Sequence, residues 1–235
     1  MFIDFHTHVL PGIDDGSASV KESIEILKAE AAQGITHVVA TPHFYANHDS
    51  PENFLEKRAK AMEILSEELK KYPELPKISL GAEVYFFHGI SDCEALPLLT
   101  IDNKRFILIE MPTPPWTESM YSELEAIYRK HGLMPIMAHM DRYIMPFSTH
   151  GIPEKFAELP VLVQANASFF QRGGLTSAMA IKLLKKDKIQ LLGTDCHNMT
   201  SRTPNLEKTI QIIEKKLGKD TIDRINKYGK MVFEE

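Results

Sequence analysis

Eight histidine and carboxylate side chains stand at, or just beyond, the ends of short apolar runs of this 235-residue chain. They are His6, His8, His43, Glu83, Glu110, His139, Asp195 and His197. Imidazole nitrogen and carboxylate oxygen atoms are ligands that suit manganese, iron, zinc and magnesium ions. Several such residues recur at equivalent points of the chain, which predicts a polynuclear metal site.

The first motif, HTH, places His6 and His8 two residues apart. On an extended segment such residues project to the same side, so both rings can reach one cation. The LPGIDDG segment follows, and its glycines allow a tight loop that returns Asp14 or Asp15 to the same place. An isolated histidine is usually packed or solvated, but here the motif is joined by GTDCHN near the other end of the chain.

Two carboxylates, Glu83 in GAEV and Glu110 in LIEM, follow strongly apolar residues. A carboxylate among buried neighbours needs a compensating cation, and a carboxylate can bridge two metal ions. The alternative is a solvated sheet edge or a salt bridge. His139 belongs to the same set, whereas Asp141 is expected to orient Arg142.

Arg142 and Arg202 follow His139 and His197 by three and five residues. A guanidinium group matches two oxygen atoms of a phosphate, and metal ions with arginines suit an anion whose charge grows during reaction. The alternative is that both arginines are exposed solubilising residues. Phosphate is therefore the predicted ligand above the metal ions.

These residues require elements that bring distant segments to one place. Seven apolar runs precede them, namely FIDFHTH, HVVATPH, ISLGAEV, FILIEM, MPIMAHM, VLVQANA and IQLLGTD. Segments with helical periodicity separate the runs, at 19–35, 51–72, 119–132, 177–188 and 205–218. Alternating strands and helices predict a parallel α/β fold, and barrels of this kind collect catalytic groups at the C-terminal ends of their strands.

The composition fits one globular domain spanning residues 1–235, with 43% hydrophobic and 25% charged residues. A net charge of −5 argues against nucleic acid as the partner. The chain begins without a signal-like or membrane-spanning stretch, and its two cysteines fit a reducing compartment, so we expect a cytoplasmic protein without membrane insertion. Cys196 could be read as a thiol nucleophile, but we expect a small buried side chain.

The motifs HTHVLPGIDDG, ATPH, GAEVYF, LIEM, AHMDRY and GTDCHN resemble those of the PHP family, named for polymerase and histidinol phosphatase. The resemblance runs from His6 to Arg202 and is strongest to the bacterial manganese-dependent protein-tyrosine phosphatases of capsule and exopolysaccharide synthesis. It implies a distorted (β/α)7 barrel, in agreement with the seven runs.

The resemblance also implies a three-metal cluster, with manganese as the expected ion and iron, zinc or magnesium as alternatives. The first ion would be held by His6, His8, Glu83 and Asp195. Glu83 would bridge to a second ion held by Glu110 and His139, and the third would take Asp15, His43 and His197. The family places its loop aspartate just before the glycine, so Asp15 is chosen over Asp14.

The implied activity is hydrolysis of phosphotyrosine by a hydroxide that the metal ions make available, acting in line with the leaving group. Arg142 and Arg202 would hold the phosphate, and His43 and His197 are counted as catalytic because a neighbouring histidine can serve the leaving group. The resemblance implies a phosphotyrosine protein as partner, such as the C-terminal tail of a polysaccharide-assembly tyrosine kinase.

Two alternatives stay open at this point. One is a phosphatase for a small ester such as histidinol phosphate, or a phosphodiesterase. The other is a silent metal-stabilised scaffold that binds a phosphorylated partner. A wide groove lined by Trp116, Tyr45 and Phe44 would favour a peptide substrate, whereas a closed basic pocket would favour a small ester.

Overall fold

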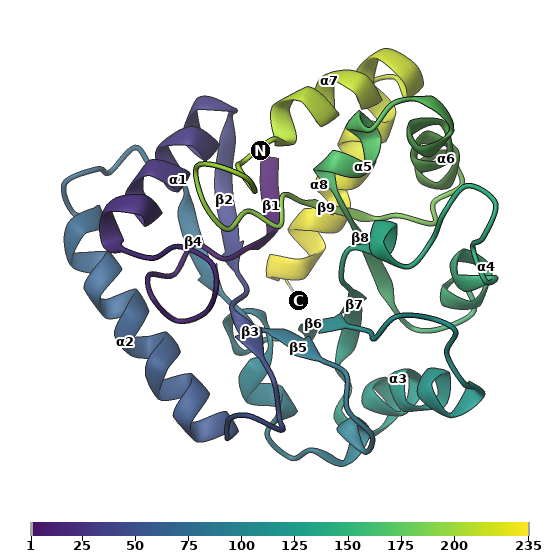
Figure 1. Cartoon of the computed structure of the whole chain (residues 1–235), viewed down its shortest axis with the longest axis horizontal. Helices are drawn as coiled ribbons and strands as arrows, with labels where there is room; N and C mark the ends of the chain where they lie inside the picture. The colour runs from purple at the N-terminus through teal and green to yellow at the C-terminus, as the bar shows by residue number, and fades with distance from the viewer. Residues whose placement is uncertain (1, 235) are drawn as a thin grey trace.

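The computed structural model describes residues 2–234, and the two end positions of the predicted domain, Met1 and Glu235, lie outside the described residues. All seven apolar runs form strands. The strands are β1 Phe2–Thr7, β2 Ile35–Ala40, β3 His43–Phe44, β4 Lys77–Leu80, β5 Glu83–Tyr85, β6 Phe106–Glu110, β7 Met134–Met137, β8 Leu162–Asn166 and β9 Leu191–Gly193. Figure 1 shows them near the middle of the molecule, with most of the helices outside.

The strands pair in parallel, in the orders β1-β2-β4 and β3-β5-β6-β7-β8-β9. Two of the runs are interrupted, so that β2 continues into β3 and β4 into β5. Hydrogen bonds from Gly81 N to Ala40 O and from Glu83 N to Pro42 O carry the pairing across the interruption. The segment after β9 pairs with β1, because Asp195 N donates a hydrogen bond to His6 O over 2.7 Å. This contact closes the sheet between its last strand and its first. The result is the distorted seven-stranded barrel predicted from the sequence.

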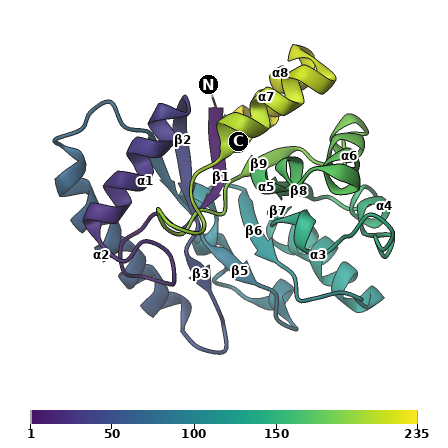
Figure 2. The ribbon, with the colours of Figure 1, turned by 45° about the horizontal axis from the view of Figure 1, so that its top comes forward.

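Helices connect the strands on the outside of the barrel. They are α1 Val20–Ala32, α2 Pro51–Leu69, α3 Glu118–His131, α4 Ile152–Phe156, α5 Ala167–Gln171, α6 Gly174–Lys185, α7 Leu206–Leu217 and α8 Lys219–Glu234, with 3-10 turns at Ile90–Asp92, Leu96–Leu99, Ile101–Asn103 and Met140–Arg142. Figure 2 shows α1 and α2 on one side of the strands and α3 to α6 on the other. Ser19 caps α1, because its hydroxyl oxygen accepts a hydrogen bond from Glu22 N. Among residues 2–234, no helix is both long and apolar enough to cross a bilayer.

Helix α8 lies beyond the helices predicted from the sequence, the last of which ends at Gly218. Gly218 has φ +83°, a conformation that ends α7 and lets α8 begin at the next residue in a new direction. α8 lies against the beginnings of the strands: the Phe233 ring stacks on His37 in β2 and on Phe5 in β1. It therefore covers the N-terminal end of the barrel.

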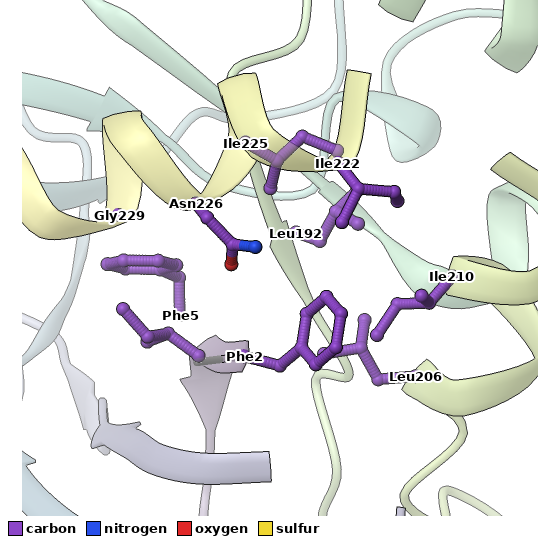
Figure 3. Close-up of a pocket in the computed structure, with 10 residues that line it drawn as sticks. Phe2, Phe5, Leu192, Leu206, Ile210, Ile222, Ile225, Asn226 and Gly229 are labelled. Carbon is purple, nitrogen blue, oxygen red and sulfur yellow. The ribbon is translucent and has the colours of Figure 1, made fainter. Parts of the chain in front are cut away.

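The contact between α8 and the barrel is apolar and close. Figure 3 shows Phe2 and Phe5 of β1 facing Ile222, Ile225 and Gly229 of α8 across a small pocket. A methyl group on Gly229 would lie 3.0 Å from Ile3 Cδ1, so glycine allows the helix to approach β1. The C-terminal ends of the strands are left to form the opposite, open face. In Figure 2 the loops that follow β1 and β9 meet at that face.

Candidate metal centre

Histidine and carboxylate side chains from six strand positions and two loops meet at the open face. β1 and the residue after it supply His6 and His8, β3 supplies His43, β5 supplies Glu83 and β6 supplies Glu110. His139, Asp195 and His197 follow β7 and β9, and Asp15 lies in the loop between β1 and α1. All nine sequence-predicted ligands thus lie in one cluster, with ring and carboxylate atoms in mutual contact.

Two glycines make room for the histidines of β1. A methyl group at Gly193 would lie 2.6 Å from His6 Cβ, and one at Gly16 would lie 2.4 Å from His8 Cβ. Real Cβ atoms do not approach so closely, so any larger residue would displace these rings. The glycines therefore hold backbone segments from both ends of the chain against the two histidines.

Four donor atoms surround one point beneath the mouth. His6 Nε2 lies 3.1 Å from His8 Nε2 and 3.1 Å from Glu83 Oε2, while Asp195 Oδ1 is 3.6 Å and 3.5 Å from the two ring nitrogens. When a metal ion binds at about 2.1 Å from each ligand, neighbouring ligand atoms are about 3.0–3.4 Å apart. These four atoms have the spacing and the chemistry of a metal-binding set.

A second set is formed by His139 and the two glutamates. His139 Nε2 lies 2.8 Å from Glu83 Oε1 and 3.2 Å from Glu110 Oε1. Glu83 is 1% exposed and uses one oxygen toward each set, so its carboxylate lies between them. His43 joins here as well, with Nδ1 3.0 Å from Glu83 Oε2 and 4.0 Å from Glu110 Oε2.

The third set lies nearer the solvent. Asp15 Oδ1 is 3.3 Å from His197 Nε2 and 3.5 Å from His43 Nε2, and the His8 ring also lies within this group. Asp14 has a different place: its carboxylate accepts hydrogen bonds from His8 Nδ1 and from the amides of Gly16 and His43. The loop geometry thus puts Asp15 among the ligand atoms and Asp14 behind the His8 ring.

Several buried atoms of the cluster have no well-aligned hydrogen-bond partner among the described residues. They are His43 Nδ1, Glu83 Oε2, His197 Nε2 and His139 Nδ1. Buried polar atoms without partners are costly in a protein interior, and a cation would satisfy the first three, which face other ligand atoms of the cluster. This supports the view that the donor set is built for metal ions.

The charges of the cluster favour cations too. Burial opposes ionisation of Glu83 and Asp195, but the nearby His6 charge and hydrogen bonds from other histidines hold the pKa of both carboxyl groups well below their usual range. Burial and the neighbouring charges of His8 and Arg202 lower the pKa of His197 to about 4. At neutral pH the cluster therefore offers carboxylates and, at His197, a neutral ring with a free lone pair.

At His8 and His139 burial opposes the charged form, but hydrogen bonds to neighbouring carboxylates raise the pKa of both rings, that of His139 to about 9. A metal ion would therefore displace a proton from each of these two rings.

Backbone strain is concentrated at two of these positions. His139 has φ +31° and Asp195 has φ +56°, in the left-handed region that residues with a Cβ atom seldom adopt. Such strain persists where the surroundings enforce it and is often found at functional sites. It turns both side chains into the cluster directly after their strands.

The two predicted arginines lie at the same place. Arg142 and Arg202 each direct a guanidinium nitrogen to one oxygen of Asp195, and Arg142 Nη1 also lies 3.3 Å from Glu110 Oε1. Both side chains keep more than a third of their surface exposed, so they stand between the cluster and solvent. The expectation for Asp141 was wrong, because its carboxylate accepts from Asn166 N and contacts Arg172 instead of Arg142.

A buried glutamine behind the histidines was not predicted from the sequence. Gln164 Oε1 accepts from His139 N over 2.7 Å and lies 3.3 Å from His6 Nδ1, while Gln164 Nε2 donates to Asn166 Oδ1. The Asn166 side-chain amide donates in turn to Asp195 Oδ2. The available signal was an amide side chain in the apolar run VLVQANA.

Asp4 was not predicted either, although in FIDFHTH it lies two residues before His6 and therefore on the same side of the strand as both histidines. It is fully buried, and its carboxylate accepts from His6 N, Thr194 N and the Thr194 hydroxyl. It thereby ties the segment bearing Asp195 to the segment bearing His6. Its role is to hold two ligand-bearing segments in register.

The aromatic residues expected to line a groove divide into two kinds. Phe44 is 1% exposed and packs on Phe54, and Trp116 packs between Tyr143 and Phe156, so both belong to the core or its edge. Only Tyr45 borders the site, where it lines a cavity of about 370 Å³ beside His43 and Asp15. Of the two alternatives, a wide groove lined by all three aromatic residues is not formed, and the cavity beside the site is bordered by Tyr45 alone of the three.

Cys196 is fully buried, as expected, and does not face the cluster as a nucleophile. Its Sγ lies 3.8 Å from Asn198 O, and burial together with the charges of Glu30 and Asp4 raises the pKa of its thiol. A thiol with a raised pKa is a poor nucleophile near neutral pH. Cys196 is therefore not expected to act as a nucleophile.

Comparison with models of protein families identifies the family of this chain. A family model described as "Capsular polysaccharide synthesis, CpsB/CapC" matches residues 2–231. The chain belongs to the CpsB/CapC family. Its curated relatives include the tyrosine-protein phosphatase YwqE of Bacillus subtilis, 27% identical over 93% of this chain and 86% of the relative.

Other relatives carry similar names. The putative tyrosine-protein phosphatase CapC of Staphylococcus aureus is 28% identical over 98% of this chain and 91% of its own length. The tyrosine-protein phosphatase CpsB of Streptococcus pneumoniae is 26% identical over 92% of this chain and 91% of its own length.

The fold also matches a solved structure. The solved structure comes from a study of YwqE from Bacillus subtilis and CpsB from Streptococcus pneumoniae, which describes both as metal-dependent tyrosine phosphatases. This chain superposes on it with a TM-score of 0.84, over 98% of this chain and 94% of the other, at 21% sequence identity. This member of the CpsB/CapC family therefore shares the barrel of those proteins.

Proposed function

We propose that this protein is a metal-dependent protein-tyrosine phosphatase. The observation that carries the proposal is the convergence of nine metal-ligand side chains and two arginines at the mouth of the barrel. Relatives matched over nearly their whole length are named tyrosine-protein phosphatases, which supports the same reaction.

We assign the metal ions as the family resemblance implies. His6, His8, Glu83 and Asp195 would hold one ion; Glu83, Glu110 and His139 a second; and Asp15, His43 and His197 a third. Manganese is the proposed ion, because the donor set consists of oxygen and imidazole nitrogen without thiolate. Bound ions would polarise the phosphate ester and make water acidic enough to attack near neutral pH.

The protein residues would orient the substrate. Arg142 and Arg202 present guanidinium groups from two sides of Asp195, and they would turn toward the phosphate oxygens, whose charge increases in the transition state. The cavity bordered by Tyr45 and His43 would receive the tyrosyl ring. A phenolate is a good leaving group, so its departure would need only modest help from a proton donor. His43 and His197 would act through the ion that they hold beside the substrate.

The proposed substrate is a phosphotyrosine protein in capsule or exopolysaccharide assembly, and we propose the C-terminal tail of an assembly tyrosine kinase. The family description of capsular polysaccharide synthesis supports this context. We keep the cytoplasm as the proposed compartment and residues 1–235 as one domain.

A substrate panel tests the proposal. Protein supplied with manganese is assayed on a phosphotyrosine peptide, the matching phosphoserine peptide, histidinol phosphate and a phosphodiester. We expect the largest kcat/KM for the phosphotyrosine peptide. Equal kcat/KM for phosphotyrosine and histidinol phosphate would leave only a general phosphatase, and binding without turnover would indicate a scaffold.

A further inference from the structure

We propose that a groove between residues 145–150 and α6 binds the substrate polypeptide to one side of its phosphotyrosine, and that it selects a segment with both apolar and acidic residues. The inference rests on the proposed phosphatase function. It adds a docking surface outside the metal centre and a chemical description of what docks there.

The groove encloses about 630 Å³ and has apolar walls. Pro146 and Phe147 line one side, and Leu175 and Met179 of α6 line the other. Phe147 is 89% exposed and Leu175 is 60% exposed, two of the largest exposures of any large apolar side chain among residues 2–234. Large apolar side chains gathered at one exposed place are typical of an interaction surface.

A hydrogen-bonded turn fixes the position of Phe147. Met145 N donates to Ser148 O over 3.1 Å and Ser148 N donates to Met145 O over 3.0 Å, closing a tight turn with Pro146 and Phe147 at its tip. Proline fixes φ at its position and stiffens the turn. The aromatic side chain is thus presented to solvent by a hydrogen-bonded turn.

The groove is basic in an acidic protein. Three lysines line the groove, namely Lys182, Lys186 and Lys188, and none of them makes an ion pair with any residue from 2 to 234. The groove has one acidic lining residue among the described residues, Glu154. Three positive charges and one negative charge give a local charge of +2, against −5 for the whole chain. Complementary charge favours acidic residues in the partner.

The groove begins close to the metal centre. Phe147 follows Arg142 by five residues. Their Cα atoms are therefore separated by at most about 18 Å, the length of a fully extended chain of five residues. A chain of contacts links the start of α6 to the metal centre. Arg172, two residues before α6, contacts the Asp141 carboxylate, which also accepts a hydrogen bond from Asn166 N. The Asn166 side chain in turn donates to Asp195. In Figures 1 and 2, α6 and α4 lie side by side at the rim of the barrel. An extended chain held at Arg142 would reach Phe147 with residues about five or six positions from the phosphotyrosine.

The test uses four synthetic phosphotyrosine peptides. Two carry leucine and three glutamates at positions four to seven, either before or after the phosphotyrosine, and two carry serines there instead. The variant combines Phe147→Ser with Lys186→Glu. The matched control combines Ile64→Ser with Lys60→Glu on the exposed face of α2, across the barrel from the groove.

We expect at least one acidic peptide to show a KM about tenfold lower than its serine counterpart. The variant should lose this preference with kcat unchanged, while the control and all values for para-nitrophenyl phosphate stay as in the parent. High salt should reduce the preference, since screening weakens charge pairing. Equal KM values for acidic and serine peptides, or a preference that the variant retains, would overturn the inference.

A binding measurement separates this inference from the proposed function. Fluorescent, unphosphorylated versions of the peptides are titrated with protein and followed by anisotropy. Stronger binding of an acidic peptide to the parent than to the variant supports the groove even if the protein hydrolyses none of the phosphopeptides. If light scattering shows that the parent is an oligomer and the variant a monomer, the groove is an interface between copies and the inference is wrong.

Discussion

Gln164 accepts a hydrogen bond from the backbone amide of His139, with 2.7 Å between His139 N and Gln164 Oε1. The same oxygen lies 3.3 Å from His6 Nδ1. One buried amide therefore positions two histidines that, in our proposal, bind different metal ions. It also leaves His6 Nε2 free to face the cluster, because the other ring nitrogen is occupied.

Replacing Gln164 with alanine should weaken metal binding about 10–100-fold, the usual effect of removing a hydrogen-bond partner of a metal ligand. Manganese affinity is measured by calorimetry on the parent, on Gln164→Ala and on Gln190→Ala. Gln190 is a suitable control because it bonds Val163 N before β9, away from the cluster. Affinity unchanged in Gln164→Ala would remove this residue from the account.

Replacing His139 with alanine should reduce turnover of a phosphotyrosine peptide by a factor of about 100 or more, because the second ion loses its only proposed imidazole ligand. The fold should be retained, as judged by circular dichroism. His131→Ala is the control, since that ring bonds Ser91 O beside α3. Full activity of His139→Ala would contradict the second metal position, and unfolding would indicate structural ions.

Arg202→Ala should lower kcat by a factor on the order of 10² and change KM less, because the guanidinium acts on charge that builds in the transition state. Arg202→Lys should recover only part of the loss, since lysine lacks the planar fork. The exposed Arg129 of α3 provides a control. If Arg202→Ala behaves like Arg129→Ala, the guanidinium is an ordinary surface charge.

Cys196 should resist alkylation near neutral pH. Burial raises the pKa of its thiol, so below that pKa the thiolate that reacts with iodoacetamide is scarce, and the side chain is also inaccessible. Mass spectrometry of a Cys93→Ser variant at about pH 8, near the ordinary pKa of a thiol, should show no modification until the protein is denatured. Rapid modification accompanied by loss of activity would favour a thiol phosphatase.

Much of the barrel could be predicted, because the runs are mainly apolar and most of them end in a histidine or a carboxylate. FILIEM and VLVQANA form β6 and β8 at nearly the expected positions. The interruptions within two runs were not evident, because they depend on pairing between Pro42 and Glu83 across neighbouring strands. Such contacts arise only when the barrel closes.

The candidate site followed the same pattern. Residue type and position at strand ends predicted which residues meet in the cluster, since barrels direct those ends to one face. The supporting residues Asp4 and Gln164 were missed, because a buried polar residue reveals its partner only in three dimensions. The sequence also left open whether Phe44 and Trp116 line a groove, because an aromatic residue beside a loop can turn to the core as easily as to the cavity.

The most direct test of the account is the dependence of phosphotyrosine hydrolysis on metal. Purified protein is treated exhaustively with a chelator, assayed on a phosphotyrosine peptide, and assayed again after titration with manganese while bound metal is measured. We predict that chelation abolishes hydrolysis and that activity returns in step with manganese uptake. Hydrolysis that survives complete removal of metal would contradict the account.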